Sequence, residues 1–494
     1  MREALYRPCR RFFPAAALAA GALLAFALAG CATNPVTGKK ELSLVSESQE
    51  LTIGSEGDKA VTAEYGLYED ARLAAHVDSI GQRLARVSHR PGLTWHFHVV
   101  DDPAVNAFAL PGGYIYITRG ILAYLNSDAQ LAGVMGHEIG HVTARHSAQQ
   151  ITRTQLYSLG LGIAAVVSPA FRRYGDAAQT GLGILFLKYS RDDESQADEL
   201  GVEYATRAGY DPREIPGTYA MLKRVSEQSG QRLPEFLSTH PDPGNRETRT
   251  GALAAQAVAG KSGLVVRGPE YVVGLENLLF GADPRQGYFE GDRFYAPELR
   301  FTIDFPAGWQ HQNTLQAVSA ATANGKVGLE LSLVEASGAS PASYAEGLRA
   351  AGKVLAVAGN DETIGGYPAW VGRLVVAGEN ATQHTLAAVY LRQDAQHLYQ
   401  ILGASGLTGD ADEHAIFTAA RSFRALSDPA RLHPTAQRVH VVRVEKTGLF
   451  NALVPGLGAQ GLDLEGTSIL NNVLADDRLD RGQLVKIVLQ GKLR

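Results

Sequence analysis

The sequence predicts a multidomain α+β protein, and three observations lead to this fold class. First, 494 residues are too many for one typical hydrophobic core and favour roughly two to four domains. Second, helical apolar patterns dominate residues 46–265, with one strand-rich stretch. Third, strand patterns and turns dominate from about residue 285. We therefore expect a mainly helical domain with a small β-sheet over 46–265, an α+β domain over 285–427 and a small unit over 438–494.

The composition is typical of a folded protein, since 45% of the residues are apolar and 20% are charged. The formal net charge is −5, and no long run of Lys and Arg occurs. Nucleic-acid binding therefore has no electrostatic support, and we expect no nucleic-acid partner.

Residues 1–30 have the pattern of a secretory signal peptide. Four Arg residues precede the short apolar run FFPAAALAAGALLAFALAG. The sequence LAGC at 28–31 resembles the bacterial lipobox, in which the cysteine is lipidated and becomes the new N-terminus. We therefore expect a lipid anchor at Cys31. The alternative is a membrane-spanning helix over 12–30, which is just long enough to cross a bilayer.

The residues after Cys31 give an expected location and an expected tether. Ala32 follows the cysteine, and by resemblance to enteric lipoproteins this favours an outer-membrane lipoprotein facing the periplasm. The segment 31–45 is polar and contains Pro and Gly, so we expect a tether between lipid and fold. Cys9 lies in the signal segment, so the processed chain can form no internal disulfide.

The helical domain contains two predicted strands. In GLTWHFHVV at 92–100, apolar and polar residues alternate, which predicts a half-buried strand with His96 and His98 on the face away from the core. LPGG at 110–113 predicts a turn, and YIYIT at 114–118 predicts a second strand.

The stretch GVMGHEIGHVTARHS at 133–147 predicts a metal site on a helix that begins with a capping box at Ser127. His137 and His141 lie one turn apart on the same helical face, so both imidazoles can bind one Zn²⁺. Glu138 is too offset to bind the metal comfortably, but it can accept a proton from a metal-bound water. The alternative is an ordinary helix with a polar face.

Small residues flank the two histidines on this helix. Glycine lowers helix stability by about 1 kcal/mol relative to alanine, so a row of glycines indicates close approach of another backbone. His146 falls on the opposite face of a continuous helix, where a packing role is favoured over metal binding. The flanking residues are Gly133, Gly136, Gly140 and Ala144.

A third metal ligand is expected within YSRDDESQADELGVEYATRAG at 189–209. Glu194 and Asp198 lie one helical turn apart, beside a flank of small residues able to meet the glycine row. Glu194 would bind the metal, and Asp198 would accept a hydrogen bond from the far nitrogen of a metal-bound histidine. The alternative is a solvated acidic helix face, which composition alone leaves equally open.

Three stretches together resemble one protein family. They are HEIGH at 137–141, NAFALPGGYIYITRG at 106–120 and YSRDDESQADELG at 189–201. In this order they resemble the HtpX and CAAX-prenyl-protease family of zinc metallopeptidases, and in particular its BepA-like and LoiP-like bacterial lipoprotein branch. The sequence NPVTGKKELSLVSE after the lipobox adds to the resemblance, which covers about residues 31–265.

The resemblance implies a gluzincin protease domain, named for its HExxH motif and glutamate ligand, with one Zn²⁺ per chain. It implies His137, His141 and Glu194 as the metal ligands and Glu138 as the general base. It implies that Asp198 supports a ligand histidine. The implied activity is endopeptidase cleavage of unfolded or misassembled cell-envelope proteins, as protein quality control.

Two further family elements concern substrate. STHPDPGNR at 238–246 resembles a motif that implies His240 and Arg246 as groups stabilising the oxyanion of the reaction. One alternative is that His240 fills the open metal position as a latch in a resting state. The other is that this stretch is only a Pro-rich turn that closes the domain. The stretch 106–118 is expected to offer a strand edge to an extended substrate.

The remaining segments carry weaker signals. Apolar stretches at 155–168 and 181–188 predict a helical hairpin near the cleft that could act as a lid. The 285–427 domain faintly resembles PsbP-like modules. The unit at 438–494 resembles a degenerate LysM module, which makes peptidoglycan a possible partner. The alternative functions are a non-proteolytic chaperone or assembly scaffold and a peptidoglycan-associated lipoprotein.

Overall fold

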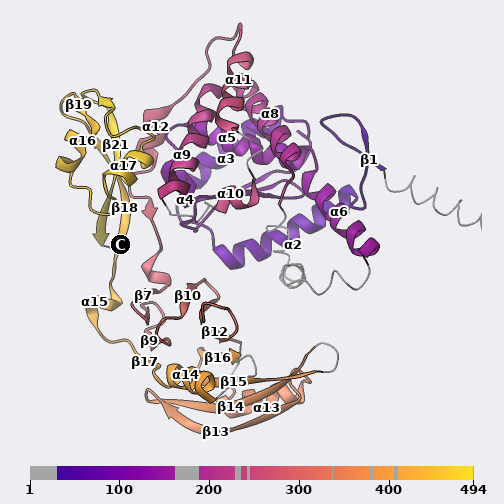
Figure 1. Ribbon diagram of the computed structural model, residues 1–494, viewed down its shortest axis with the longest axis vertical. Coiled ribbons are helices and arrows are strands. Elements are labelled where there is room, and N and C mark those ends of the chain that lie inside the picture. Colours follow the sequence, from indigo (N-terminus) through magenta and orange to yellow (C-terminus); the bar gives the residue numbers. More distant parts are fainter. Residues whose placement is uncertain are drawn as a thin grey trace, which may run out of the picture.

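The computed structural model describes residues 31–161, 188–228, 235–241, 245–335, 338–378, 382–404 and 410–492 (Figure 1). The expected signal peptide and most of the expected helical hairpin lie outside the described residues. A helical region, a middle domain and a C-terminal unit follow one another along the chain (Figure 1). In the described part of the chain, no helix combines the length and the apolar character that crossing a bilayer requires.

The helical region packs around a three-stranded sheet of order β3-β5-β4. β3 (His96–Val100) is parallel to the central β5 (Tyr114–Thr118), and β4 (Ala107–Leu110) is antiparallel to it and lies at the edge. The two expected strands are therefore confirmed. The helices around the sheet are α2 (Glu47–Tyr65), α3 (Ala71–Val87), α4 (Arg119–Tyr124), α5 (Asp128–Thr143), α6 (His146–Leu161), α8 (Arg191–Arg207), η3 (Pro212–Glu214), α9 (Ile215–Gln228), α10 (Glu235–Thr239), α11 (Arg246–Ala257) and α12 (Gly268–Gly274).

The motif helix is α5, and it begins where the sequence predicts. The Ser127 hydroxyl accepts a hydrogen bond from the Gln130 backbone N–H at 3.1 Å, which caps the helix. Every residue of α5 is buried. The helix ends earlier than expected, at Thr143, because Arg145 adopts a left-handed conformation (φ 60°) and α6 begins at His146.

Residues 31–45, the expected tether, are ordered and pack against the helical region. The segment forms a hairpin of β1 (Cys31–Thr33) and β2 (Lys40–Leu42) that packs against the junction of α5 and α6. The Asn34 side chain is 3% exposed and donates a hydrogen bond to the Ala144 carbonyl at 3.1 Å. Val45 is buried in a small apolar cluster with Ala148 of α6. This packing was not predicted, because a sequence pattern does not show what a polar side chain will bind.

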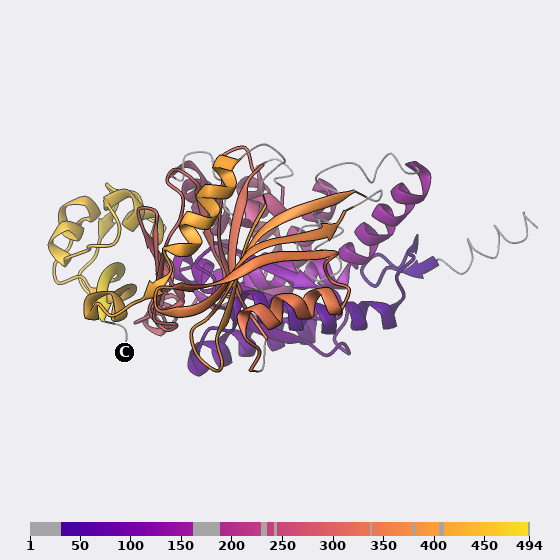
Figure 2. The same ribbon diagram turned by 90° about the horizontal axis from the view of Figure 1, so that it is seen from below.

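The middle domain consists of two antiparallel sheets with its own hydrophobic clusters. α13 (Pro341–Ala350) lies across one face of the larger sheet (Figure 2), and α14 (Asp410–Arg421) covers the other face. The larger sheet has the order β10 (Gln310–Asn313), β11 (Ala317–Ala321), β12 (Gly328–Val334), β16 (Leu398–Ala404), β15 (Gln383–Arg392), β14 (Tyr367–Ala377) and β13 (Ala356–Ile364). The smaller sheet has the order β17 (Arg424–Ala425), β9 (Phe301–Asp304), β8 (Arg293–Ala296) and β7 (Tyr288–Glu290), with η4 (Pro284–Gln286) before it.

The C-terminal unit lies beside the helical region and shares a sheet with it. β18 (Thr435–Arg443) pairs with β21 (Leu484–Lys492) on one side and with β6 (Leu279–Phe280) on the other. β6 follows α12 directly, so the end of the helical region completes this sheet. The smaller elements are α15 (Pro429–Leu432), β19 (Gly448–Leu449), α16 (Phe450–Leu453), η6 (Val454–Leu457), α17 (Leu464–Leu470) and β20 (Arg478–Leu479).

Candidate metal centre

Two helices, α5 and α8, meet through small residues and bring the polar motifs together. A Cβ atom added to Gly136 would lie 3.0 Å from the carbonyl oxygen of Gly201. One added to Gly201 would lie 3.1 Å from the backbone nitrogen of His137. The expected close approach at the glycine row is therefore confirmed. It allows the side chains of one turn of α8 to reach the histidines of α5.

Four buried side chains converge between α5, α8 and the end of α10. Their ligand atoms all lie within 4.8 Å of one another, and they belong to His137, His141, Glu194 and His240. The Nε2 atoms of His137 and His141 are 3.0 Å apart. The Glu194 carboxylate lies 3.5 Å from each of these two atoms.

The donor set fits a zinc ion. A tetrahedral Zn²⁺ with bonds of about 2.0–2.1 Å separates its ligand atoms by roughly 3.3–3.4 Å. The distances among the two imidazoles and the Glu194 carboxylate lie close to this value. Two neutral imidazoles and one carboxylate are also a set that catalytic zinc sites use.

Glu138 faces the same cluster without a hydrogen-bond partner of its own. Its side chain is fully buried, and among the described residues neither carboxylate oxygen accepts a hydrogen bond. Burial raises the pKa of the Glu138 carboxyl above its ordinary value. A buried carboxylate without partners is costly, which points to a function rather than to stability.

Asp198 supports His137 from the side away from the cluster. Its Oδ1 atom lies 3.0 Å from His137 Nδ1, so Nδ1 can donate while Nε2 faces the metal position. Burial alone would raise the pKa of Asp198, but the hydrogen bond from His137 and the charge of Arg246 lower it to about 2. The structure thus places Asp198 where the sequence predicts.

His146 lies on a different side of the motif helix from the one that a continuous helix predicts. Because α5 ends at Thr143, His146 is not carried to the opposite helical face, and its Nδ1 atom lies 2.9 Å from His141 Nδ1. It therefore contacts a candidate ligand on the side away from the metal position. The Tyr189 ring also stacks on the His141 ring, with centroids 3.9 Å apart. No sequence pattern had indicated a role for Tyr189.

Arg246 and His240 are both brought to the site. The Arg246 guanidinium lies 2.5 Å from Asp198 Oδ1 and 3.1 Å from Glu194 Oε2. His240 Nδ1 lies 3.0 Å from Glu194 Oε1 and 3.3 Å from His137 Nε2. The Tyr219 hydroxyl donates to Asp198 at 2.7 Å, and no motif in the sequence pointed to it.

Comparison with known proteins agrees with this geometry. Residues 71–251 match the model of the family described as Peptidase family M48. The chain is 38% identical to the mitochondrial metalloendopeptidase OMA1 of Arabidopsis thaliana, over 37% of this chain and 35% of that protein. It is 31% identical to the beta-barrel assembly-enhancing protease of Escherichia coli, over 43% and 45% of the two chains. It is 32% identical to OMA1 of Schizosaccharomyces pombe, over 43% and 63%. The chain therefore spans less than two thirds of the length of each of these relatives.

Proposed function

We propose that this chain is a zinc-dependent endopeptidase of the bacterial cell envelope, because residues 71–251 match the model of peptidase family M48. Its substrates would be unfolded or misassembled envelope proteins. The observation that carries the proposal is the buried donor set of His137, His141 and Glu194, with Glu138 beside it accepting no hydrogen bond from the described residues. The names of the relatives, two metalloendopeptidases and a beta-barrel assembly-enhancing protease, support both the reaction and the substrate class.

The residues divide into ligands, base and supports. Zinc, when bound, polarises the scissile carbonyl and lowers the pKa of water. His137, His141 and Glu194 would hold it, and Asp198 would keep His137 in the correct tautomer. Glu138 would accept the proton of the attacking water and pass it to the leaving amine.

We propose that His240 closes the site in a resting form of the protein. His240 is 1% exposed, and its Nδ1 atom supplies a fourth donor where substrate would otherwise approach. Its ring stacks on Phe236 of α10, with centroids 4.5 Å apart. In an open form, withdrawal of α10 would free this position, and His240 and Arg246 could then stabilise the oxyanion.

The substrate would pair with the edge strand β4. The sheet order leaves this strand without a neighbour on one side among the described strands. The Phe236 backbone N–H, at the start of α10, lies 3.4 Å from the Val105 carbonyl just before β4. The movement that frees the metal would therefore also free the entrance to this edge, where an extended peptide could add a strand.

We also propose that Cys31 carries a lipid and places the protein on the outer membrane, facing the periplasm. LAGC at 28–31 and the family resemblance support this location. The variant Cys31→Ser should accumulate as unprocessed precursor and take up no labelled fatty acid. Continued labelling would refute the anchor without affecting the proposed reaction.

The test of the reaction is cleavage of casein by the purified chain. We expect cleavage that stops with a chelator and returns when zinc is added back. Cleavage that persists in the chelator would refute a metal-dependent reaction. No cleavage by the zinc-loaded chain would favour the non-proteolytic scaffold.

A further inference from the structure

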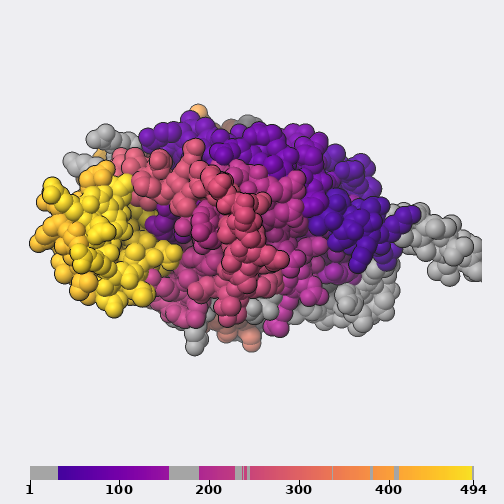
Figure 3. All heavy atoms as spheres, turned by 90° about the horizontal axis from the view of Figure 1, so that it is seen from above, coloured from indigo at the N-terminus to yellow at the C-terminus, as the bar shows by residue number. Residues whose placement is uncertain are grey.

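The C-terminal unit (438–494) shares a hydrophobic core with the helical region. Val439, Ile469, Leu470 and Val488 are each at most 1% exposed and belong to the same core as residues of α5 and α8. The space-filling view shows the yellow C-terminal unit in direct contact with the magenta helical region (Figure 3). The unit also has a small hydrophobic cluster of its own, which includes Phe450 and Ile487, so only one side of it packs into the core of the helical region.

A buried lysine fixes this contact. The Lys486 amine, on β21, donates to the carbonyl oxygens of Ala123 and Leu125 at 2.6 and 2.7 Å. These carbonyls lie at the end of α4, where a helix leaves acceptors without internal partners. A buried amine is costly unless it is hydrogen-bonded, so these two bonds define where the unit sits.

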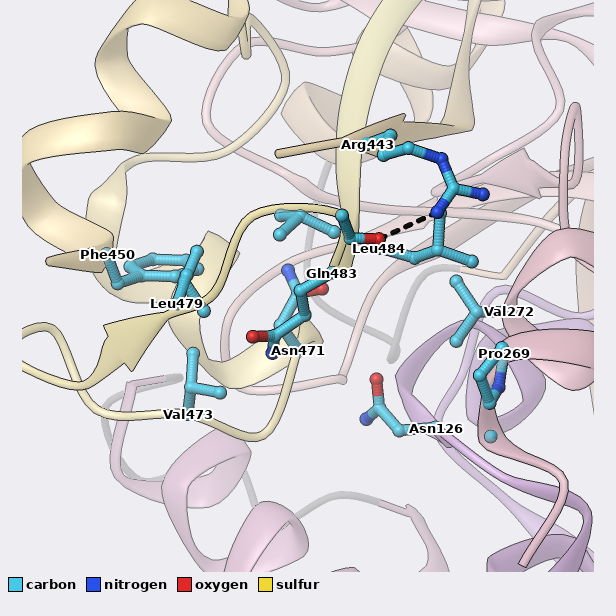
Figure 4. A pocket seen from close by; sticks show the side chains of 13 residues that line it. Asn126, Pro269, Val272, Arg443, Phe450, Asn471, Val473, Leu479, Gln483 and Leu484 are labelled. Atoms are coloured by element: carbon cyan, nitrogen blue, oxygen red, sulfur yellow. Dashed lines mark hydrogen bonds between the residues drawn. The ribbon is translucent and has the colours of Figure 1, made fainter. Parts of the chain in front are cut away.

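A cavity of about 340 Å³ lies at the seam between the unit and the helical region (Figure 4). Its polar side chains already have partners inside the protein. Asn126 donates to the Tyr124 carbonyl, Asn471 to the Lys486 carbonyl, and Arg443 to the Gly482 carbonyl. These three bonds each lie on one side of the seam, and Asn126 also donates across it to the Leu470 carbonyl at 3.4 Å. The cavity therefore gives no argument for a ligand.

One face of α9 binds the C-terminal unit through Arg224. Its guanidinium donates to the Val473 carbonyl at 2.7 Å and to the Ser468 hydroxyl at 2.6 Å. It also pairs with Glu465 at 2.9 Å. Gly217, two turns earlier on the same face, lies so close that an added Cβ would be 2.9 Å from the Asn472 side chain.

The opposite face of α9 supports the metal centre through Tyr219. The Tyr219 hydroxyl and Arg246 both donate to Asp198 Oδ1, which is the oxygen that lies 3.0 Å from His137 Nδ1. The Arg246 guanidinium also lies over the Tyr219 ring, 4.4 Å from its centroid. Tyr219 therefore holds the carboxylate that orients a candidate metal ligand.

We propose that the C-terminal unit braces the metal centre, which means that its contacts hold α9 in place. Tyr219 of α9 is then the positioning residue that keeps Asp198 in its place beside His137. The inference rests on the proposed zinc site and extends it to a part of the chain outside the M48 match. It assigns the unit a structural task in metal binding that does not require it to bind a ligand.

The first test is the zinc affinity of Tyr219→Phe, measured by competition with a chelator of known affinity. Loss of the hydroxyl should weaken binding about 10–100-fold, because support of a ligand histidine typically contributes this much. The matched control is Tyr116→Phe, which removes a tyrosine–aspartate hydrogen bond of the same 2.7 Å length, to Asp58. An affinity of Tyr219→Phe equal to that of the control would overturn the positioning role.

The second test is Arg224→Ala, which breaks the contact of α9 with the unit and leaves the metal centre untouched. Zinc affinity should fall about 2–30-fold, the range for residues that act through a chain of packed contacts. The matched control is Arg421→Ala, whose bidentate ion pair with Glu362 lies in the middle domain. If Arg224→Ala unfolds the chain, Arg224→Gln provides the same measurement in a milder variant.

The outcomes separate the two proposals. Absence of zinc binding by the wild-type chain would refute the zinc site itself. Wild-type binding with an unchanged affinity in folded Arg224 variants would overturn the brace and leave the zinc site standing.

Discussion

His146 Nδ1 lies 2.9 Å from His141 Nδ1, on the side of the His141 ring that faces away from the metal position. With Nε2 of His141 directed at the metal, its Nδ1 carries the proton and donates to His146. His146 Nε2 can then donate to Gln196 Oε1, also at 2.9 Å. A partner of this kind fixes the tautomer and the ring orientation of a ligand histidine.

We therefore expect His146→Ala to weaken zinc binding about 10–100-fold while one zinc per chain still binds at saturation. Competition with a chelator measures the affinity, and metal analysis gives the stoichiometry. His76→Ala is the control, because His76 contacts a buried carboxylate, Asp128 at 2.8 Å, outside the metal centre. A wild-type affinity in His146→Ala would show that this contact does not orient His141.

The early end of α5 explains why the sequence placed His146 on the wrong face. Neither Gly nor Pro follows Thr143, so no local signal stops the helix. The end depends on distant partners instead. Arg90 donates to the Val142 carbonyl at 3.3 Å, and Asn34 donates to the Ala144 carbonyl at 3.1 Å. Only the folded structure brings these donors to the end of the helix.

Asn34→Ala should destabilise the protein by about 1–3 kcal/mol, because it leaves the buried Ala144 carbonyl with one partner fewer. Urea unfolding of the purified chain measures the change. Thr37→Ala is the control, since it removes a hydroxyl that accepts a hydrogen bond from the Lys39 backbone N–H at an exposed position. Equal stability of the two variants would show that the Asn34 contact does not anchor residues 31–45 to the helices.

The contact between α5 and α8 predicts opposite effects for two glycine substitutions. Gly201→Ala should destabilise the chain by about 1–3 kcal/mol, because the added Cβ would press on the His137 backbone at 3.1 Å. Gly251→Ala on α11 should stabilise it by up to about 1 kcal/mol, because its Cβ would meet only Pro216, at 3.7 Å. Thermal unfolding measures both changes. If Gly201→Ala is as stable as the wild type, the two helices can move apart without a loss of stability.

The candidate ligands and Asp198 could be predicted from the sequence and Tyr219 could not, for one physical reason. His137, His141 and the pair Glu194 and Asp198 follow helical spacing, which depends only on neighbours in the chain. Tyr219 reaches Asp198 through tertiary packing, which leaves no periodic signal. In the middle domain, β13 is mostly exposed and four consecutive residues at 360–363 are polar, so the apolar alternation that marks a strand is missing from its sequence.

Glu138→Gln provides the sharpest separation of catalysis from structure. The amide keeps the size of the side chain but cannot accept the proton of the attacking water, so casein cleavage should fall by about 10²–10⁴-fold or more. Zinc binding should persist, because Glu138 is not among the candidate ligands. The metal-free variant should be at least as stable as the wild type, since a neutral amide replaces a buried carboxylate that has no hydrogen-bond partner among the described residues. Glu203→Gln, at an exposed position on α8, should change none of the three measurements. Cleavage by Glu138→Gln at nearly the wild-type rate would refute proteolysis at this site and leave the assembly scaffold as the function of the fold.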